Sequence, residues 1–137
     1  MNALPQPARL PHRYPFLIID RVVDTQSGHW IRAELRVARN NPLLTPEGIL
    51  PAVFLIEAIA QAGALLYNLD QDLPSLLGLE NVTFPAFARA GDQVLLYTEA
   101  LWLRNGIGRA NGVAHRDDGT LLCALSLTFA LTPRDAL

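Results

Sequence analysis

A carboxylate and an amide four residues apart are the side chains best placed to do chemistry in this sequence. Glu57 and Gln61 lie in residues 51–69, an otherwise apolar stretch, and residues i and i+4 share one face of a helix. No lysine or arginine lies in this stretch. An unpaired buried carboxylate is costly or takes a raised pKa. Glu57 is therefore either a structural residue, which pairs with an arginine from elsewhere or reaches solvent at an interface, or an active-site acid.

The stretch that carries this pair predicts a helix over residues 51–69 that is apolar almost all round. Pro51 suits the first helical position, and alanine, leucine and isoleucine favour the interior. The apolar run is too short for a membrane span and is interrupted by Glu57. We expect the helix to lie in the protein core, with no membrane contact.

Length and composition restrict the class of protein. The 137 residues predict one domain over residues 1–137, and the net charge of -2, with no basic run, gives no reason to expect nucleic-acid binding. The one cysteine, Cys123, excludes an internal disulfide and is expected in the core. We expect no cofactor and no metal ion. Residues 1–10 lack the pattern of a signal peptide, so a cytoplasmic location is expected.

The rest of the chain predicts antiparallel strands joined by tight turns. A small-residue stripe of Gly108, Ala110, Gly112 and Ala114 repeats every second residue, and we expect the helix to lie against such a small-residue face. The predicted class is α+β, with a long central helix wrapped by a curved antiparallel sheet of five to six strands. The apolar outer face of that sheet predicts a symmetric oligomer. The expected strands cover residues 16–24, 30–37, 75–84, 92–105, 107–116 and 121–131, with a loop at 40–50.

Four segments in order carry a resemblance to a known family. Residues 10–22 (LPHRYPFLIIDRV), 51–65 (PAVFLIEAIAQAGAL), 90–94 (AGDQV) and 106–130 resemble the FabZ-type 3-hydroxyacyl-[acyl-carrier-protein] dehydratases. The Leu-Pro-His start and the Pro-Ala helix entry are also similar to aryl-polyene pathway dehydratase subunits. The resemblance implies a hotdog fold and dimers whose sheets join edge to edge, as a homodimer or a trimer of dimers.

The same resemblance implies a chemistry and reveals a missing residue. The family removes water from a 3-hydroxyacyl thioester in fatty-acid or polyketide-type biosynthesis. Glu57 matches the family acid, and the backbone N–H of Ala52 would polarise the thioester oxygen. The family histidine lies fourteen residues before the acid, where this chain has Leu43. Leucine is no base, and losing a general base typically costs roughly 10²–10⁴-fold in rate.

The chain has three other histidines, and none matches the missing one. His12 is expected in a loop, His29 beside a turn, and His115 at an exposed strand end. Residues 84–89 keep only Arg89 where the family often carries more arginines, so the substrate carrier is either acyl carrier protein or coenzyme A.

Four hypotheses about function stay open. The chain is a working or weakened dehydratase, one half of a heterodimer with a histidine-bearing homologue, a hotdog acyl thioesterase that uses Glu57, or a non-catalytic subunit that binds acyl thioesters or is structural. The candidates for contact with the substrate are Tyr14, Phe16, Phe54, Leu55, Ala58 and Gln61.

Overall fold

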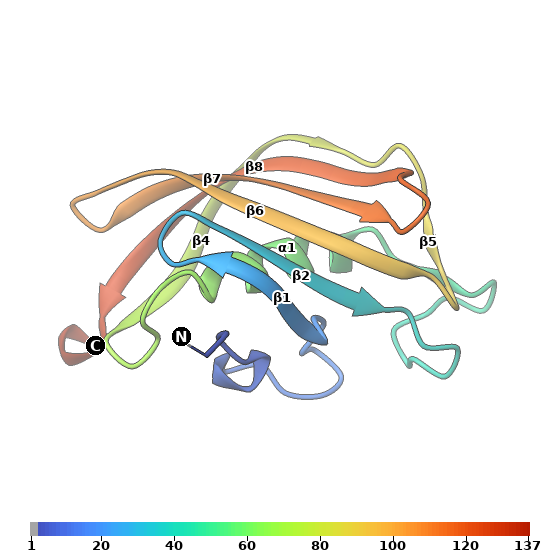
Figure 1. Cartoon of the computed structure of the whole chain (residues 1–137), viewed down its shortest axis with the longest axis horizontal. Helices are drawn as coiled ribbons and strands as arrows, with labels where there is room; N and C mark the ends of the chain where they lie inside the picture. The colour runs from blue at the N-terminus through green and yellow to red at the C-terminus, as the bar shows by residue number, and fades with distance from the viewer. Residues whose placement is uncertain (1–2) are drawn as a thin grey trace.

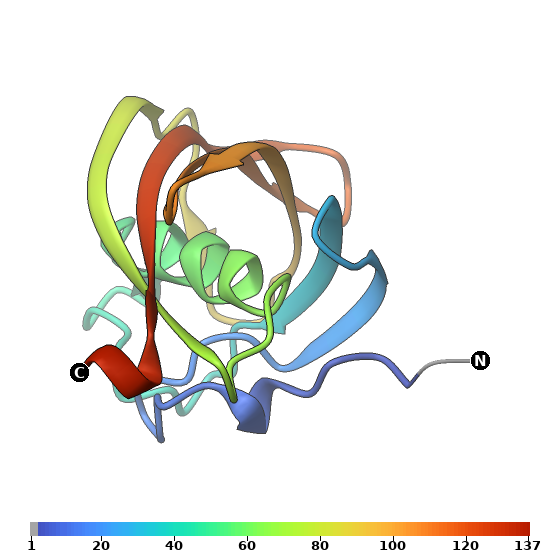
Figure 2. The same cartoon turned by 90° about the vertical axis from the view of Figure 1, so that its left-hand side faces the viewer.

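A curved antiparallel sheet wraps around one α-helix in the computed structural model, which describes residues 3–137 (Figures 1 and 2). The six-stranded sheet has the order β1-β2-β6-β7-β8-β4, and β3 pairs with β5 in a small second sheet. This architecture confirms the α+β prediction. Residues 1 and 2 of the predicted domain lie outside the described part. The elements are η1 (Pro7–Arg9), β1 (Arg21–Gln26), β2 (Trp30–Arg36), β3 (Ile49–Leu50), α1 (Val53–Ala64), β4 (Asp72–Thr83), β5 (Ala88–Arg89), β6 (Gln93–Arg104), β7 (Ile107–Arg116), β8 (Leu121–Pro133) and η2 (Arg134–Ala136).

The helix packs closest to the sheet where side chains are smallest. The stripe Gly108, Ala110, Gly112 and Ala114 on β7 is buried, as predicted. A Cβ on Gly112 would overlap the Cγ2 atom of Ile59, so only glycine admits the helix at this distance. On β6, the Thr98 hydroxyl donates to the Ile59 carbonyl at 3.0 Å. These contacts fix the height of α1 above the sheet.

Strand β8 turns its large face toward the core, and not its small one. Cys123, Leu125, Leu127 and Phe129 are buried, whereas the small alternate residues are only partly buried. The prediction that the helix lies against the small-residue face is therefore right for β7 and wrong for β8. Because Gly112 holds the helix close to β7, space remains above β8, and larger side chains fill that space.

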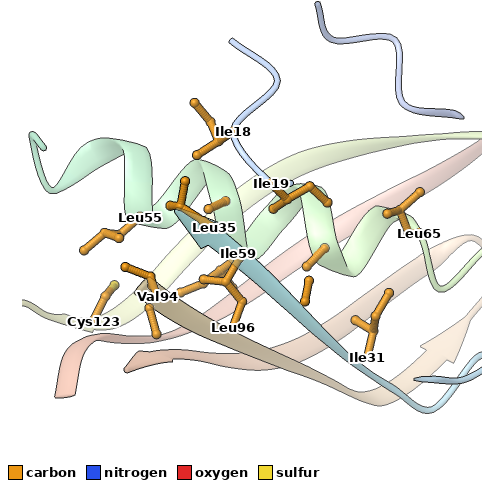
Figure 3. Packing of buried hydrophobic residues seen from close by; sticks show 14 of the residues in the cluster. Ile18, Ile19, Ile31, Leu35, Leu55, Ile59, Leu65, Val94, Leu96 and Cys123 are labelled. Atoms are coloured by element: carbon orange, nitrogen blue, oxygen red, sulfur yellow. The ribbon is translucent and has the colours of Figure 1, made fainter. Parts of the chain in front are cut away.

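The core between α1 and the sheet is continuous (Figure 3). Leu55 and Ile59 point from the helix toward Val94 and Leu96 of β6, with Leu35 of β2 beside them. Each of these side chains is at most 2% exposed. Full burial of one such aliphatic side chain stabilises the fold by about 1.5–3 kcal/mol.

The helix is shorter than the prediction of residues 51–69. Ala52 is the N-cap, and the last helical residue is Ala64. Beyond it, the backbone N–H groups of Leu65 and Leu66 donate to carbonyls three residues earlier, which tightens the chain into a turn. Leu65, Leu66 and Leu69 are nevertheless buried. The apolar pattern thus continues past the end of the helix.

The N-terminal segment runs beneath α1 on the side that the sheet leaves open (Figure 2). The predicted strand 16–24 is wrong for residues 16–20, because β1 begins at Arg21. The backbone of Phe16 and Ile18 bonds instead to the side chain of Gln61 on the helix. The predicted loop 40–50 is correct except for its last two residues, which form β3.

One edge and one face of the sheet expose apolar side chains. Strand β4 is the last strand of the sheet, with β8 as its neighbour. The prediction that strand 92–105 is covered on both faces does not hold within one chain, because alternate residues of β6 are exposed. The exposed apolar residues of β4 and β6 include Leu76, Leu77, Leu79, Leu95, Leu101, Trp102 and Leu103. No helix within residues 3–137 is long and apolar enough to cross a bilayer.

Candidate active site

Glu57 meets His12, a residue 45 positions earlier, at the open side of the helix. The Nε2 atom of His12 lies 3.0 Å from Oε1 of Glu57. The two side chains are 33% and 40% exposed, so the carboxylate is not buried as the apolar helix suggested. Glu57 has a polar neighbour and reaches the surface, which resolves the energetic problem of an unpaired charge in a core.

Gln61 holds the same carboxylate oxygen from one turn further along α1. Its Nε2 donates to Glu57 Oε1 at 3.0 Å and to the Phe16 carbonyl at 2.8 Å. Its Oε1 accepts from the Ile18 N–H at 2.9 Å. A backbone donor and a backbone acceptor therefore fix which way the amide faces. Gln61 is 1% exposed, and its hydrogen bonds tie the N-terminal segment to Glu57.

These contacts engage one oxygen of Glu57 and leave the other free. Oε1 accepts the N–H of Gln61 and lies 3.0 Å from Nε2 of His12, while Oε2 has no hydrogen-bond partner within residues 3–137. A hydrogen bond between His12 and Glu57 at this separation would place the hydrogen on Nε2. The remaining nitrogen, Nδ1, is buried and has no hydrogen-bond partner in the described part of the chain. His12 is thus placed beside the oxygen of Glu57 that Gln61 also contacts.

A cavity of about 150 Å³ opens beside this cluster and continues along α1. His12, Glu57 and Gln61 form its polar part. The wall beyond them is mainly apolar, and it comes from the helix, the turn after it and strands β4, β7 and β8. Its remaining residues are Ala60, Gly63, Ala64, Leu66, Tyr67, Pro74, Ser75, Leu76, Ala110, Leu127 and Phe129. Burial raises the pKa of the Tyr67 hydroxyl, which keeps this wall uncharged.

The other predicted catalytic positions lie outside this cavity. Leu43 is partly buried against the core, and its backbone N–H donates to Oδ1 of the Asn41 side chain at 2.8 Å. Ala52 is the N-cap of α1 with helical φ and ψ of -58° and -28°. Neither residue lines the cavity that holds Glu57. Their roles stay predictions.

Of the six predicted substrate contacts, only Gln61 lines this cavity. Leu55 and Ala58 point into the core and are at most 1% exposed. Tyr14 and Phe16 are 81% and 57% exposed. Phe54 is partly buried against the core. Sequence reasoning placed the contacts near the start of the helix, whereas the cavity follows the face that carries Ala60, Ala64 and Tyr67.

The remaining histidines and Arg89 do not line the cavity that contains Glu57. His29 is exposed, and His115 lines a separate hollow on the outer face of the sheet with Arg32 and Tyr97. Arg89 is exposed, and its backbone N–H donates to Asp92. Within residues 3–137, no three histidine, cysteine, aspartate or glutamate side chains cluster as metal ligands would.

Comparison with known families decides the relationship. Residues 5–81, a stretch that contains both His12 and Glu57, match the family model described as ApeP dehydratase, of the ApeP-like type. The chain belongs to the ApeP-like dehydratase family. This ApeP-like chain is also 38% identical over 133 residues to the 3-hydroxyacyl-[acyl-carrier-protein] dehydratase FabZ of Pasteurella multocida, covering 90% of this chain and 87% of the relative. The FabZ of Bacillus subtilis is 35% identical over 130 residues, with 89% and 92% covered.

Solved structures confirm the hotdog fold of this ApeP-like protein. The dehydratase heterocomplex ApeI:P from Xenorhabdus doucetiae has a TM-score of 0.82 at 22% identity, covering 98% of this chain and 95% of that one. A thioesterase with coenzyme A from Streptococcus pneumoniae has a TM-score of 0.71 at 12% identity, covering 82% and 85%. The resemblance to FabZ-type dehydratases is confirmed by the identities of 38% and 35% to the two FabZ relatives.

His12 is the residue that sequence reasoning undervalued. It lies in the Leu-Pro-His motif, which was expected to form a loop, and the loop is where it lies. The sequence did contain a signal: one family motif carries this histidine and another carries the acid, so the two motifs could have been expected to meet at one site. A contact between them requires that the N-terminal segment cross the open face of the helix.

Proposed function

We propose that this chain is the acid-bearing subunit of a 3-hydroxyacyl-thioester dehydratase, completed by a base from a second subunit. One observation carries the proposal. Oε1 of Glu57 is held by His12 and Gln61, while Oε2 has no partner in the described chain and belongs to a residue that lines the cavity. Such a carboxyl group is oriented to present one proton from a defined oxygen.

The reaction needs an acid and a base on neighbouring carbons of the substrate. The base takes a proton from C2, and the electrons of that C–H bond form the C2=C3 double bond. The C3–O bond breaks while Glu57 Oε2 gives its proton to the departing hydroxyl, so water leaves. Glu57 then recovers a proton before the next cycle. The backbone N–H of Ala52 is our candidate for polarising the thioester oxygen.

The missing component of the site is the base. His12 donates through Nε2 to Glu57, and its Nδ1 is buried, so neither nitrogen offers a free lone pair to the substrate. Leu43 stands where the family histidine is expected. In hotdog dimers the site is built across the interface. A partner's histidine would therefore complete this chain's Glu57.

The substrate and the partner are inferred from the cavity and the relatives. The apolar wall beyond Glu57 suits an acyl chain. We assign the thioester to acyl carrier protein, because the FabZ relatives are named for that carrier. Heteromeric assembly is supported by the ApeI:P heterocomplex, which has a similar fold. A cytoplasmic location is proposed from the same relationship.

Complementation between two variants of this chain tests the divided site. The wild type is co-expressed with a Leu43→His/Glu57→Gln double variant, and each is also purified alone. Mass spectrometry follows the loss of one water from 3-hydroxyacyl-carrier protein. In a mixed dimer, one site combines the introduced histidine of one subunit with the Glu57 of the other. We expect the wild type and the double variant to be inert when each is assayed alone, and their mixture to be active. The Leu43→His single variant, assayed alone, should also be active.

Several outcomes would contradict the proposal. Dehydration by the wild type alone, lost in Glu57→Gln, would mean that the chain supplies its own base. An inert mixture beside an active Leu43→His variant would mean that the two residues act within one subunit. Release of free thiol in place of water loss would indicate a thioesterase.

A self-contained dehydratase is the second candidate, because of the 3.0 Å contact between His12 and Glu57. A change of tautomer would free the Nε2 lone pair as a base. Under this alternative, His12→Phe removes the activity of the wild type. The divided site predicts no wild-type activity to remove.

A further inference from the structure

The cavity beside Glu57 has a defined far end. Its helical wall is formed by Glu57, Ala60, Ala64 and, after the helix, Tyr67, at spacings that keep one face. Ala64 lies seven positions after Glu57, which corresponds to about 10 Å along the helix axis. The cavity therefore begins at the carboxyl group and ends near the C-terminus of α1.

Two aromatic rings stand at that end. Tyr67 follows the helix and Phe129 lies on β8, and their ring centroids are 5.4 Å apart with planes tilted by 42°. Both residues line the cavity. Beyond Glu57 and Gln61, the helical wall consists of Ala60, Gly63 and Ala64, and Ala110 lines the cavity from β7. Large rings thus follow small residues along this wall.

Gly108 decides how far the Phe129 ring withdraws. The two residues are directly paired across β7 and β8. A Cβ on Gly108 would overlap three carbons at the outer part of the ring. The ring occupies the space that a side chain at position 108 would take. Any side chain there must push the ring away from β7 and toward Tyr67 and the cavity.

We propose that Tyr67 and Phe129 close the acyl cavity and determine the longest acyl group that the chain accepts, with Gly108 setting its depth. The ligand class is an acyl thioester, because the cavity beyond Glu57 and Gln61 is lined mainly by apolar residues, with alanine and glycine on the helix and Ala110 on β7. This inference rests on the proposed function for the identity of the ligand as an acyl group. It does not require that the chain be catalytically active.

Binding measurements with acyl-pantetheine thioesters of increasing length test the inference. Saturated chains without a 3-hydroxyl group cannot be dehydrated, so affinity is measured by calorimetry without turnover. We expect affinity to rise by at most roughly fourfold for each methylene that the cavity takes up. It should stop rising, or fall, at a cut-off length.

Variants at the end of the cavity should move that cut-off in opposite directions. Phe129→Leu and Tyr67→Leu should each extend it, and Gly108→Ala should shorten it. Phe84→Leu is the matched control, because Phe84 is 41% exposed and lies outside the cavity. Circular dichroism confirms that each variant is folded. If Gly108→Ala does not fold, the two leucine variants still decide the question.

The outcomes separate this inference from the proposed function. An unchanged cut-off in both folded leucine variants would overturn the aromatic end wall, even if the dehydration assay succeeds. Failure of the wild type to bind any chain length would also overturn it. A cut-off that shifts as expected supports it, even if no mixture of subunits dehydrates a substrate.

Discussion

Gln61 Nε2 lies 3.0 Å from Glu57 Oε1, and the same amide is bonded to the backbone on both sides of Leu17. One buried side chain therefore sets the position of the carboxyl group and of the N-terminal segment together. The segment that carries His12 and the helix that carries Glu57 are joined at this point. Order in one of them requires order in the other.

Replacement of Gln61 by leucine should destabilise the fold. Leucine has a similar volume but leaves the Ile18 N–H and the Phe16 carbonyl without their partners. An unsatisfied buried group costs about 1–3 kcal/mol. Urea unfolding should show a lower midpoint with an unchanged slope. Gln71→Leu, at an exposed position, is the matched control and should change stability by less than about 0.5 kcal/mol. Equal stability of the Gln61 variant and the wild type would contradict the role of the amide as a tie.

Substitution of His12 distinguishes an orienting residue from a base. The test uses the Leu43→His background, in which we expect activity. His12→Phe should lower kcat by about two- to tenfold, the effect of one hydrogen bond between neutral groups. His12→Gln should recover much of it, because its amide can donate an N–H to Glu57. Steady-state kinetics measure both. An equal loss of roughly 10²–10⁴-fold in the two variants would instead identify His12 as the base.

Gly112→Ala should be destabilising because its Cβ overlaps Ile59. Overpacking of a well-packed core costs about 1–3 kcal/mol. Ile59→Ala removes the overlapping atom, at a cavity cost of about 2–5 kcal/mol. The double variant should lose less stability than the two losses added together, as chemical denaturation would reveal. Gly78→Ala provides the control, since a Cβ there meets nothing within 4 Å. If the two losses of stability simply add, the helix instead moves away from β7 in the Gly112→Ala variant.

Cys123 should make stability fall at alkaline pH. Burial raises the pKa of its thiol from 9.0 to about 11. Above pH 9 the thiol ionises in the unfolded state but keeps its proton in the folded state, so ionisation stabilises the unfolded state. The stability that the protonated thiol contributes to the fold is fully present below pH 9 and is lost as pH rises through 11. Urea unfolding at a series of pH values should show a steeper decline for the wild type than for Cys123→Ala. Parallel declines would rule out this contribution.

Much of the fold follows from local patterns in the sequence. Asn105 and Gly106 both adopt positive φ, of 53° and 76°, at the turn that joins β6 to β7, as an Asn-Gly pair predicts. The alternation in residues 30–37 gave β2, since period two places one side of a strand in the core. Such signals need only neighbouring residues, and they are reliable for that reason.

The parts that could not be predicted depend on contacts between distant segments. Residues 16–20 form a mainly apolar run that is typical of a strand, yet the backbone of Phe16 and Ile18 bonds to Gln61 on the helix. On β8, the prediction chose the face of small residues, whereas the more hydrophobic face of large residues points inward. The contact of His12 with Glu57 depends on how the N-terminal segment crosses the helix (Figure 2). Family resemblance named the acid but not this neighbour.

The open edge of strand β4 affects the solubility of the protein in a cell. Its twelve residues form the end of the sheet, with backbone groups on one side left without a strand and with Leu76, Leu77 and Leu79 exposed. An edge of this kind is a template for any extended chain. Copies whose β4 edge stays uncovered would associate through it or aggregate. With the second subunit that we propose, the ratio in which the two are synthesised would therefore matter for solubility.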